Sequence, residues 1–177
     1  MSQFSMHILI DGYNLIRQSI DLRRYERQNL ESGRRALIDW LADYRRRKGH
    51  PITVVFDGWE SGSPLEESDY SSGIHIIYSG RGVKADDVIK RITASTDEEI
   101  LIVSSDREII SFANRRGKAT LSSPEFEAIV NRQAASPDDA DPEEKDDEEN
   151  ARPANKKGPA RRLSRAQKQA RSKIRKL

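Results

Sequence analysis

Short apolar runs alternate with longer segments of mixed polarity along the first 137 residues of the chain. Runs of three to five residues that are rich in Ile, Leu and Val are typical of buried strands. Five strands are predicted on this basis, at residues 6–10, 52–56, 74–78, 100–103 and 119–121. Residues 58–73 are rich in Ser, Gly and Glu, and we expect them to form a long polar loop.

The segments between these runs show helical spacing. Residues 30–48 place Leu37, Trp40, Leu41 and Tyr44 at positions i, i+3, i+4 and i+7, which gives a helix one apolar face. Further helices are predicted to begin near residues 86, 107 and 123. Strands that alternate with helices pair in parallel through right-handed crossovers. The pattern therefore predicts an α/β fold, a three-layer sandwich around a central, mainly parallel sheet of about five strands.

Beyond residue 137 large apolar residues almost disappear, and the charges segregate along the chain. The net charge of +2 hides this change, because residues 1–137 carry 19 basic and 20 acidic side chains whereas residues 138–177 carry 12 and 9. We expect a folded domain over residues 1–137, an acidic disordered linker over residues 138–151 and a basic tail over residues 152–177. Ser164 and Gln167 have the spacing that caps a helix in this tail.

Several classes of protein are excluded by what the chain lacks. It has no cysteine, so disulfide partners and thiolate metal sites are excluded. It has no secretory signal and no apolar stretch near the roughly 20 residues of a membrane span. We therefore expect a cytoplasmic protein with no membrane partner; the sequence sets no oligomeric state.

Five aspartates stand at or just beyond the carboxyl ends of the predicted strands. Parallel strands present these ends at one edge of the sheet, where open α/β sheets bind their ligands. Two like charges about 4 Å apart repel by about 4 kcal/mol at an effective dielectric near 20, so such a cluster either binds protons or takes a hard cation. Oxygen ligands favour Mg²⁺ or Mn²⁺. The metal ligands predicted in this way are Asp11, Asp57, Asp86, Asp87 and Asp106.

Each of these motifs also has an ordinary structural explanation. Asp, Gly and Asn are common turn residues, and Asp86 and Asp87 suit the first turn of a helix. Their recurrence at successive strand-to-helix junctions favours the metal site. Basic and polar residues nearby are expected to contact a phosphate-containing substrate, and Tyr13 and Trp59 to stack on bases. The predicted substrate contacts are Asn14, Ser105, Arg81, Lys84 and Arg107, and those in the tail are Arg161, Arg162, Arg165, Lys168 and Arg171.

The sequence lacks the motifs of three other classes of protein that bind nucleotides or phosphate groups. A phosphatase of the haloacid dehalogenase kind needs a second Asp two residues after the first, and that position holds Tyr13. The glycine pattern of a dinucleotide-binding domain is absent, as is the phosphate-binding loop of the nucleoside triphosphatases.

Four segments resemble, in order and spacing, the YacP-like branch of the NYN domain family: Asp11-Gly12-Tyr13-Asn14, VVFDG, GVKADD and IVSSDRE. The resemblance covers roughly residues 6–133. These proteins are relatives of the PIN-domain ribonucleases, so the resemblance implies a PIN-like sandwich and metal-dependent endoribonuclease activity. It also implies that Asn14 lies near the substrate and that metal is bound at Asp11, Asp57, Asp86 or Asp87, and Asp106.

The predicted function is a metal-dependent endoribonuclease that cleaves RNA phosphodiester bonds through a metal-activated water, with Asp11, Asp87 and Asp106 as the catalytic residues. RNA, free or on the ribosome, is the expected partner. The alternative is a catalytically silent RNA-binding module that keeps the fold and binds through its basic tail. The cluster of carboxylates disfavours this alternative, because negative charge hinders RNA binding.

Removal of residues 152–177 should flatten the salt dependence of RNA binding while the chemistry of the domain survives. Each phosphate of single-stranded RNA that the tail neutralises contributes about 0.7 to the slope of log K against log salt, so removing the tail should reduce that slope. Titration of fluorescent RNA at several salt concentrations measures the slope for the full and the shortened chain. An unchanged slope would mean that the tail takes no part in binding.

Overall fold

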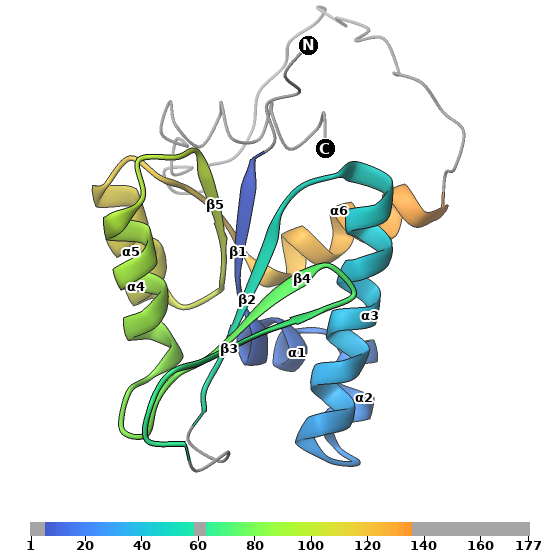
Figure 1. The fold of residues 1–177 in the computed structure, drawn as a ribbon. Helices are drawn as coiled ribbons and strands as arrows, with labels where there is room; N and C mark the ends of the chain where they lie inside the picture. Colours follow the sequence, from blue (N-terminus) through green and yellow to red (C-terminus); the bar gives the residue numbers. More distant parts are fainter. Residues whose placement is uncertain (1–5, 59–62, 136–177) are drawn as a thin grey trace, which may run out of the picture.

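The computed structural model describes residues 6–58 and 63–135, which form three layers around a six-stranded sheet (Figure 1). The strands are β1 (His7–Asp11), β2 (Ile52–Phe56), β3 (Glu67–Ser71), β4 (Ile74–Tyr78), β5 (Ile100–Val103) and β6 (Ala119–Leu121). The helices are α1 (Gly12–Gln18), α2 (Ile20–Glu26), α3 (Leu30–Lys48), α4 (Ala85–Ser95), α5 (Arg107–Arg115) and α6 (Ser123–Ala135). The predicted α/β sandwich is confirmed. The linker and tail predicted beyond residue 137 lie outside the described residues, as does Trp59.

The strands lie in the order β3-β4-β2-β1-β5-β6, and every neighbouring pair is parallel except β3 with β4. β1 is central, with β2 on one side and β5 on the other. The chain thus winds away from β1 in both directions, and such a reversal opens a crevice at the carboxyl edge of a sheet. This topology places the carboxyl ends of β1, β2 and β5 side by side, at the position where folds of this kind have their crevice.

The prediction of a loop over residues 58–73 is wrong in part, because β3 forms within this segment. All five residues of β3 are exposed and none of them is aliphatic, so the strand carries no apolar signal. It is specified instead by antiparallel pairing with β4 through a tight turn in which Ser72 and Gly73 both have positive φ angles, 52° and 81°. Two-residue hairpin turns require this backbone conformation.

Two helices that the sequence analysis did not predict occupy the segment between β1 and α3. α1 begins directly after Asp11, so the DGYN segment is a strand end and a helix start rather than a loop. Ser19 ends α1 and caps α2, where its Oγ accepts a hydrogen bond from the Leu22 amide at 3.1 Å. α3 ends where predicted, at Gly49, which has a left-handed φ of 74°.

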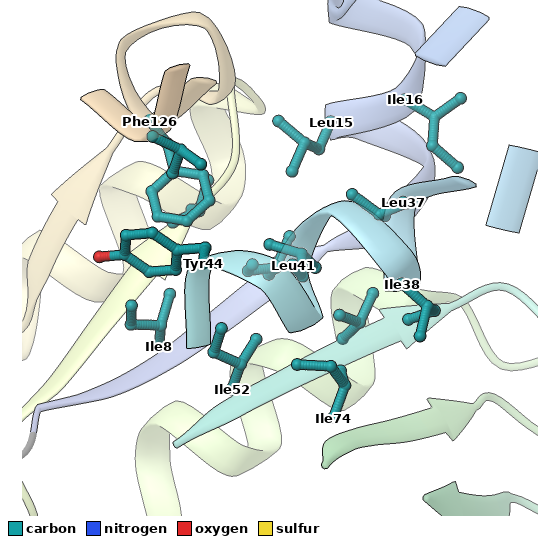
Figure 2. Close-up of a cluster of buried hydrophobic side chains, with 14 of the residues drawn as sticks. Ile8, Leu15, Ile16, Leu37, Ile38, Leu41, Tyr44, Ile52, Ile74 and Phe126 are labelled. Carbon is teal, nitrogen blue, oxygen red and sulfur yellow. The ribbon is translucent and has the colours of Figure 1, made fainter. Parts of the chain in front are cut away.

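The sheet buries an apolar core on each face. Helices α1, α2, α3 and α6 cover one face, and α4 and α5 cover the other (Figure 1). Strand alternation divides β1 between them, because Ile8 and Ile10 join the first core and Leu9 the second. In the first core the ring of Tyr44 of α3 meets that of Phe126 of α6 edge-on, and Leu41 of α3 belongs to the same cluster (Figure 2). None of the helices in the described ranges is long and apolar enough to cross a membrane.

Replacement of Leu41 by Ala should lower the free energy of unfolding by about 2–5 kcal/mol, because the side chain is fully buried and its loss leaves a cavity. Urea denaturation followed by circular dichroism measures the change. Arg46→Ala on an exposed position of the same helix is the control and should stay within about 0.5 kcal/mol of the parent. Equal effects of the two substitutions would contradict this account of the core.

Candidate active site

Asp11 stands at the centre of the carboxyl edge of the sheet, as the last residue of β1 and the N-cap of α1. Its side chain is 8% exposed and accepts hydrogen bonds from the Asn14 amide at 3.4 Å and from Ser104 Oγ at 3.1 Å. The next residue must be glycine, because a Cβ on Gly12 would collide with the ring of Phe56. The close approach of α1 to β2 therefore keeps Asp11 at the floor of the site.

Burial raises the pKa of Asp11 to about 6. The hydrogen bonds from Ser104 and from the Asn14 amide lower this pKa, whereas the negative charges of Asp86 and Asp57 raise it further. At neutral pH the carboxyl group is therefore ionised at an energetic cost, and a bound cation would offset that cost. The effect of the other two aspartates shows that these side chains share one electrostatic environment.

Asp57 follows β2 and holds the start of α4. Its Oδ1 accepts a hydrogen bond at 2.7 Å from the amide of Ala85, which lies 28 residues later in the chain. Asp57 thus caps α4, whose own N-cap residue, Lys84, makes no side-chain cap bond. Gly58 lies against the chain after β4, where a Cβ would collide with the Ser79 carbonyl oxygen. This packing draws the ends of β2 and β4 together with the first turn of α4.

The capped first turn of α4 brings Asp86 into the crevice. Asp86 is half-buried, and its pKa is raised by burial and then by the charges of Asp106 and Asp57, against the opposing charge of Lys90. Asp87 lies one position further round the helix and is exposed. Sequence reasoning proposed both residues as metal ligands and Asp87 as catalytic; the structure groups Asp86 electrostatically with Asp11.

Asp106 approaches the same crevice from β5. It caps α5, with Oδ1 accepting from the amides of Glu108 at 2.7 Å and Ile109 at 3.2 Å. Its own amide donates to Ser104 Oγ at 3.1 Å, and that hydroxyl in turn donates to Asp11 Oδ2. Ser104 is fully buried, and its hydroxyl links the carboxyl group of Asp11 to the main chain of Asp106.

Asn14 and Ser105, which were predicted to contact substrate, are held by bonds within the protein. Asn14 Oδ1 accepts from the Ser105 amide at 2.9 Å and from Ser123 Oγ at 2.8 Å, and Ser105 Oγ accepts from the Ser123 amide at 3.2 Å. These bonds join α1, the start of α5 and the start of α6. Sequence analysis did not find a role for Ser123 in the site, because a Ser before Pro124 signals no more than a helix start.

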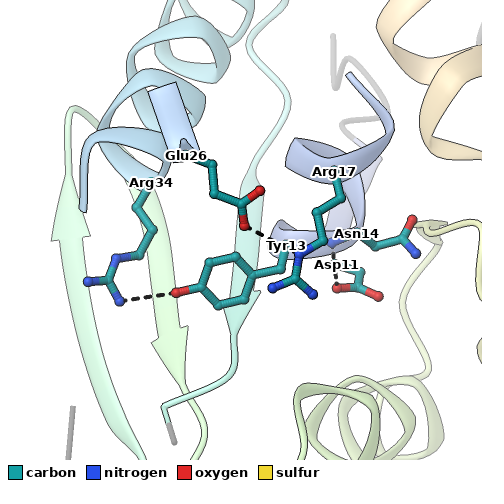
Figure 3. A network of polar contacts seen from close by, with 6 residues as sticks. All are labelled: Asp11, Tyr13, Asn14, Arg17, Glu26 and Arg34. Atoms are coloured by element: carbon teal, nitrogen blue, oxygen red, sulfur yellow. Dashed lines mark hydrogen bonds and ion pairs between the residues drawn. The ribbon is translucent and has the colours of Figure 1, made fainter. Parts of the chain in front are cut away.

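The aromatic side chain nearest the cluster does not face a substrate. Tyr13 is only 7% exposed, and its ring meets that of Phe56 edge-on at 5.1 Å, so the expected stacking on bases is wrong for this residue. Its hydroxyl accepts a hydrogen bond from Arg34 at 3.4 Å, and Arg17 lies over its ring and pairs with Glu26 (Figure 3). Tyr13 thus supports α1 from within the core.

The basic residues expected to bind phosphate lie at the helix starts that border the crevice. Lys84 directly precedes α4 and Arg107 is the first residue of α5. Arg81 lies in the turn before Lys84, and its amide donates to the Ser63 carbonyl at 3.0 Å. All three side chains are exposed, and all three residues lie at or just before the first turns of α4 and α5.

The donor set fits a hard cation held partly through water. Within residues 6–58 and 63–135, no three His, Asp or Glu side chains come together as a ready-made ligand group. Mg²⁺ commonly keeps several waters and takes only one or two carboxylates from the protein, which this spread of aspartates can supply. The histidines take no part, because His7 and His75 lie in the amino-terminal halves of β1 and β4 and His50 precedes β2.

Comparison with known proteins identifies a family and a shared fold. Residues 8–176 match the YacP-like NYN domain. The protein "Uncharacterized protein YacP" of Bacillus subtilis (strain 168) is 26% identical over 102 residues, which are 56% of this chain; the chain spans 59% of the length of that relative.

Two crystal structures of Rae1 (YacP) from Bacillus subtilis superpose on the fold. One, of a point mutant, has a TM-score of 0.63 at 22% identity and covers 73% of this chain and 77% of that chain. The other has a TM-score of 0.58 at 23% identity, with coverage of 72% and 75%. At these identities the likeness concerns the fold.

The raised pKa of Asp11 predicts a pH-dependent cost of folding. Because the folded pKa of about 6 exceeds the unfolded value near 3.9, the cost is fully present above pH 6 and disappears as the pH falls below 4. Two pKa units correspond to about 3 kcal/mol. In EDTA, the advantage of Asp11→Asn over the parent in unfolding free energy should therefore shrink by about 2 kcal/mol between pH 7.5 and 4. Urea denaturation at several pH values measures it, and a constant difference would contradict the raised pKa.

Proposed function

This chain belongs to the YacP-like NYN domain family, and we propose that it is an endoribonuclease that hydrolyses RNA phosphodiester bonds with Mg²⁺ or Mn²⁺. Membership of the family supports a nuclease-type or RNA-related role. The observation that carries the proposal is the shared electrostatic environment of Asp11, Asp57, Asp86 and Asp106 at the reversal point of the sheet. Four carboxylates in one crevice repel RNA unless a cation lies between them and the phosphate.

The aspartates have distinct roles in this proposal. Ser104 links the carboxyl group of Asp11 to the main-chain amide of Asp106, which brings the two residues together, and Asp86 adds a third carboxylate from α4. A divalent cation supplies charge that neutralises the scissile phosphate and lowers the pKa of a water. We assign the contribution of α4 to Asp86 rather than Asp87, because Asp86 is half-buried beside the other carboxylates. Asp57 holds α4 in place and adds negative charge.

The surrounding residues position the RNA and the aspartates. Lys84, Arg81 and Arg107 border the crevice from exposed positions and bind backbone phosphates, which orients the strand without reading its sequence. Asn14 and Ser123 act through the chain rather than on substrate, because their hydrogen bonds set the distance between the helices that carry Asp11 and Asp106. We therefore expect cleavage wherever the RNA backbone is accessible, whether the RNA is free or bound to a ribosome.

The decisive experiment is cleavage of a mixed cellular RNA preparation, ribosomes included, with Mn²⁺ or Mg²⁺ and with EDTA. Asp11→Asn, Asp86→Asn and Asp106→Asn, each shown to be folded, should reduce the rate by at least about 100-fold, the scale on which a preorganised charged group acts. Asp87→Asn is the matched control for Asp86→Asn and should stay within about threefold of the parent. EDTA should abolish cleavage.

Three other outcomes would contradict parts of this proposal. Cuts that persist in the folded Asp11 and Asp106 variants belong to a contaminating enzyme, and the carboxylate site is then not the source of activity. A larger loss in Asp87→Asn than in Asp86→Asn would reverse the assignment on α4. Absence of cleavage from both free RNA and ribosomes, with salt-sensitive RNA binding that is lost on removal of residues 152–177, would identify a silent RNA-binding module instead.

A further inference from the structure

A groove of about 460 Å³ lies between α2 and α3, outside the carboxylate site. Leu22, Ala36 and Trp40 give it apolar walls, and Tyr25 stands beside them with 49% of its surface exposed. Its other lining residues are polar or charged: Asp21, Gln28, Ser32, Arg35 and Asp39. An apolar trough with a polar border, lying between two helices, has the form that receives a further amphipathic helix.

The groove lies beside the point where the chain leaves the described domain. Trp40 donates a hydrogen bond from Nε1 to Asn131 Oδ1 of α6 at 3.1 Å, and its ring meets Phe126 of the same helix edge-on. Asn131 stands about one helical turn before Ala135, the last described residue. The remaining 42 residues of the chain therefore begin next to Trp40, at one end of the groove.

The last 17 residues have the sequence pattern of a helix that fits such a groove. Between residue 136 and the end, the large apolar residues are Leu163, Ile174 and Leu177. With Ala166 and Ala170 they fall at i, i+3, i+7, i+11 and i+14, which places all five on one narrow stripe of a helix. Lys and Arg occupy eight of the twelve other positions of residues 161–177, Ser and Gln occupy the remaining four, and acidic residues are absent from this segment.

We propose that residues 161–177 dock as a helix into the groove between α2 and α3 of the same chain. The apolar stripe faces Leu22, Ala36 and Trp40. The carboxylates of Asp21 and Asp39 face the basic flanks of the helix, and Arg35 is the single basic residue in the lining. The family match extends to residue 176, so this segment belongs to the pattern that the family shares.

The connection is long enough and favours docking within one chain. Residues 136–160 supply 25 residues, which span at most about 80–90 Å when fully extended, far more than the distance of about one helical turn between Ala135 and Asn131 beside Trp40. A tether of this kind gives an effective concentration in the millimolar range. A helix that would bind as a separate peptide with a Kd of about 0.1 mM would therefore occupy the groove most of the time.

Docking at this place carries the basic segment toward the catalytic edge. The lining residues of α3 lie in its amino-terminal half, and α3 returns the chain from the carboxyl edge of the sheet to the start of β2. The groove therefore lies toward the same edge as the aspartates. The consequence for RNA, additional positive charge toward this edge, rests on the proposed function, but the docking itself does not.

The absence of cysteine allows a direct test in the full chain. Ala36→Cys places a thiol in the groove, and it is paired with Ala170→Cys on the stripe or with Ser172→Cys on the opposite side of the same helix. A short bismaleimide is added in the absence of RNA, and intramolecular cross-linking is followed by mass spectrometry. The Ala170 pair should cross-link at least fivefold faster than the Ser172 pair. Equal rates, or cross-links formed only between chains, would overturn the proposal.

Fluorescence of Trp40 provides a second readout that needs no cysteine. In a Trp59→Phe background Trp40 is the single tryptophan. Leu163→Asp with Ile174→Asp should raise acrylamide quenching of Trp40 about twofold, to the value of a chain that ends at residue 160. Gln169→Asp with Ser172→Asp makes the same change of charge off the stripe and should leave quenching unchanged. Equal quenching in both double variants would overturn the proposal, whether or not the protein cleaves RNA.

Discussion

The buried carboxyl group of Asp11 is the feature around which this edge of the structure is organised. A charge at the end of the central strand is stable only if polar groups surround it, and the start of α1 and the hydroxyl of Ser104 provide them. The hydrogen bond to Asp11 gives Ser104, which directly follows β5, its role, and the nearby ring of Phe56 is the reason that a glycine must follow Asp11. Because burial still keeps the pKa of Asp11 high, the folded protein retains a local excess of negative charge that a cation can relieve.

The aspartates combine structural and chemical roles. Asp11 and Asp106 cap the helices that follow them, and Asp57 caps α4 across a gap of 28 residues. Each cap bond orients a carboxyl group at a helix start, where the helix dipole also stabilises negative charge. The helix-capping explanation and the metal-binding explanation are therefore compatible, since the bonds that begin the helices also gather the carboxylates.

The residues behind the aspartates are tied together in a similar way. Asn14 and Ser123 form hydrogen bonds with each other and with Ser105, so the helices that carry the aspartates cannot move independently. The cost of burying these polar groups is offset because they pair with one another. Basic residues remain outside, at exposed positions on the border of the crevice. Negative charge at the floor and positive charge at the border suit a cation and a polyanionic strand at once.

The sequence alone determined the fold class and four of the five predicted strands to the residue, because apolar periodicity is a local signal. The metal-binding role of the aspartates stays a prediction. The sequence could not reveal β3, whose exposed residues are ordered by pairing with β4, nor the roles of Ser104 and Ser123, whose partners lie about 90 and 110 residues away. The proposed assignment to Asp86 rather than Asp87 also rests on the tertiary structure. The side chains of adjacent helical residues point in different directions. Only the packing of α4 against β1 and β2 decides which of the two is partly buried.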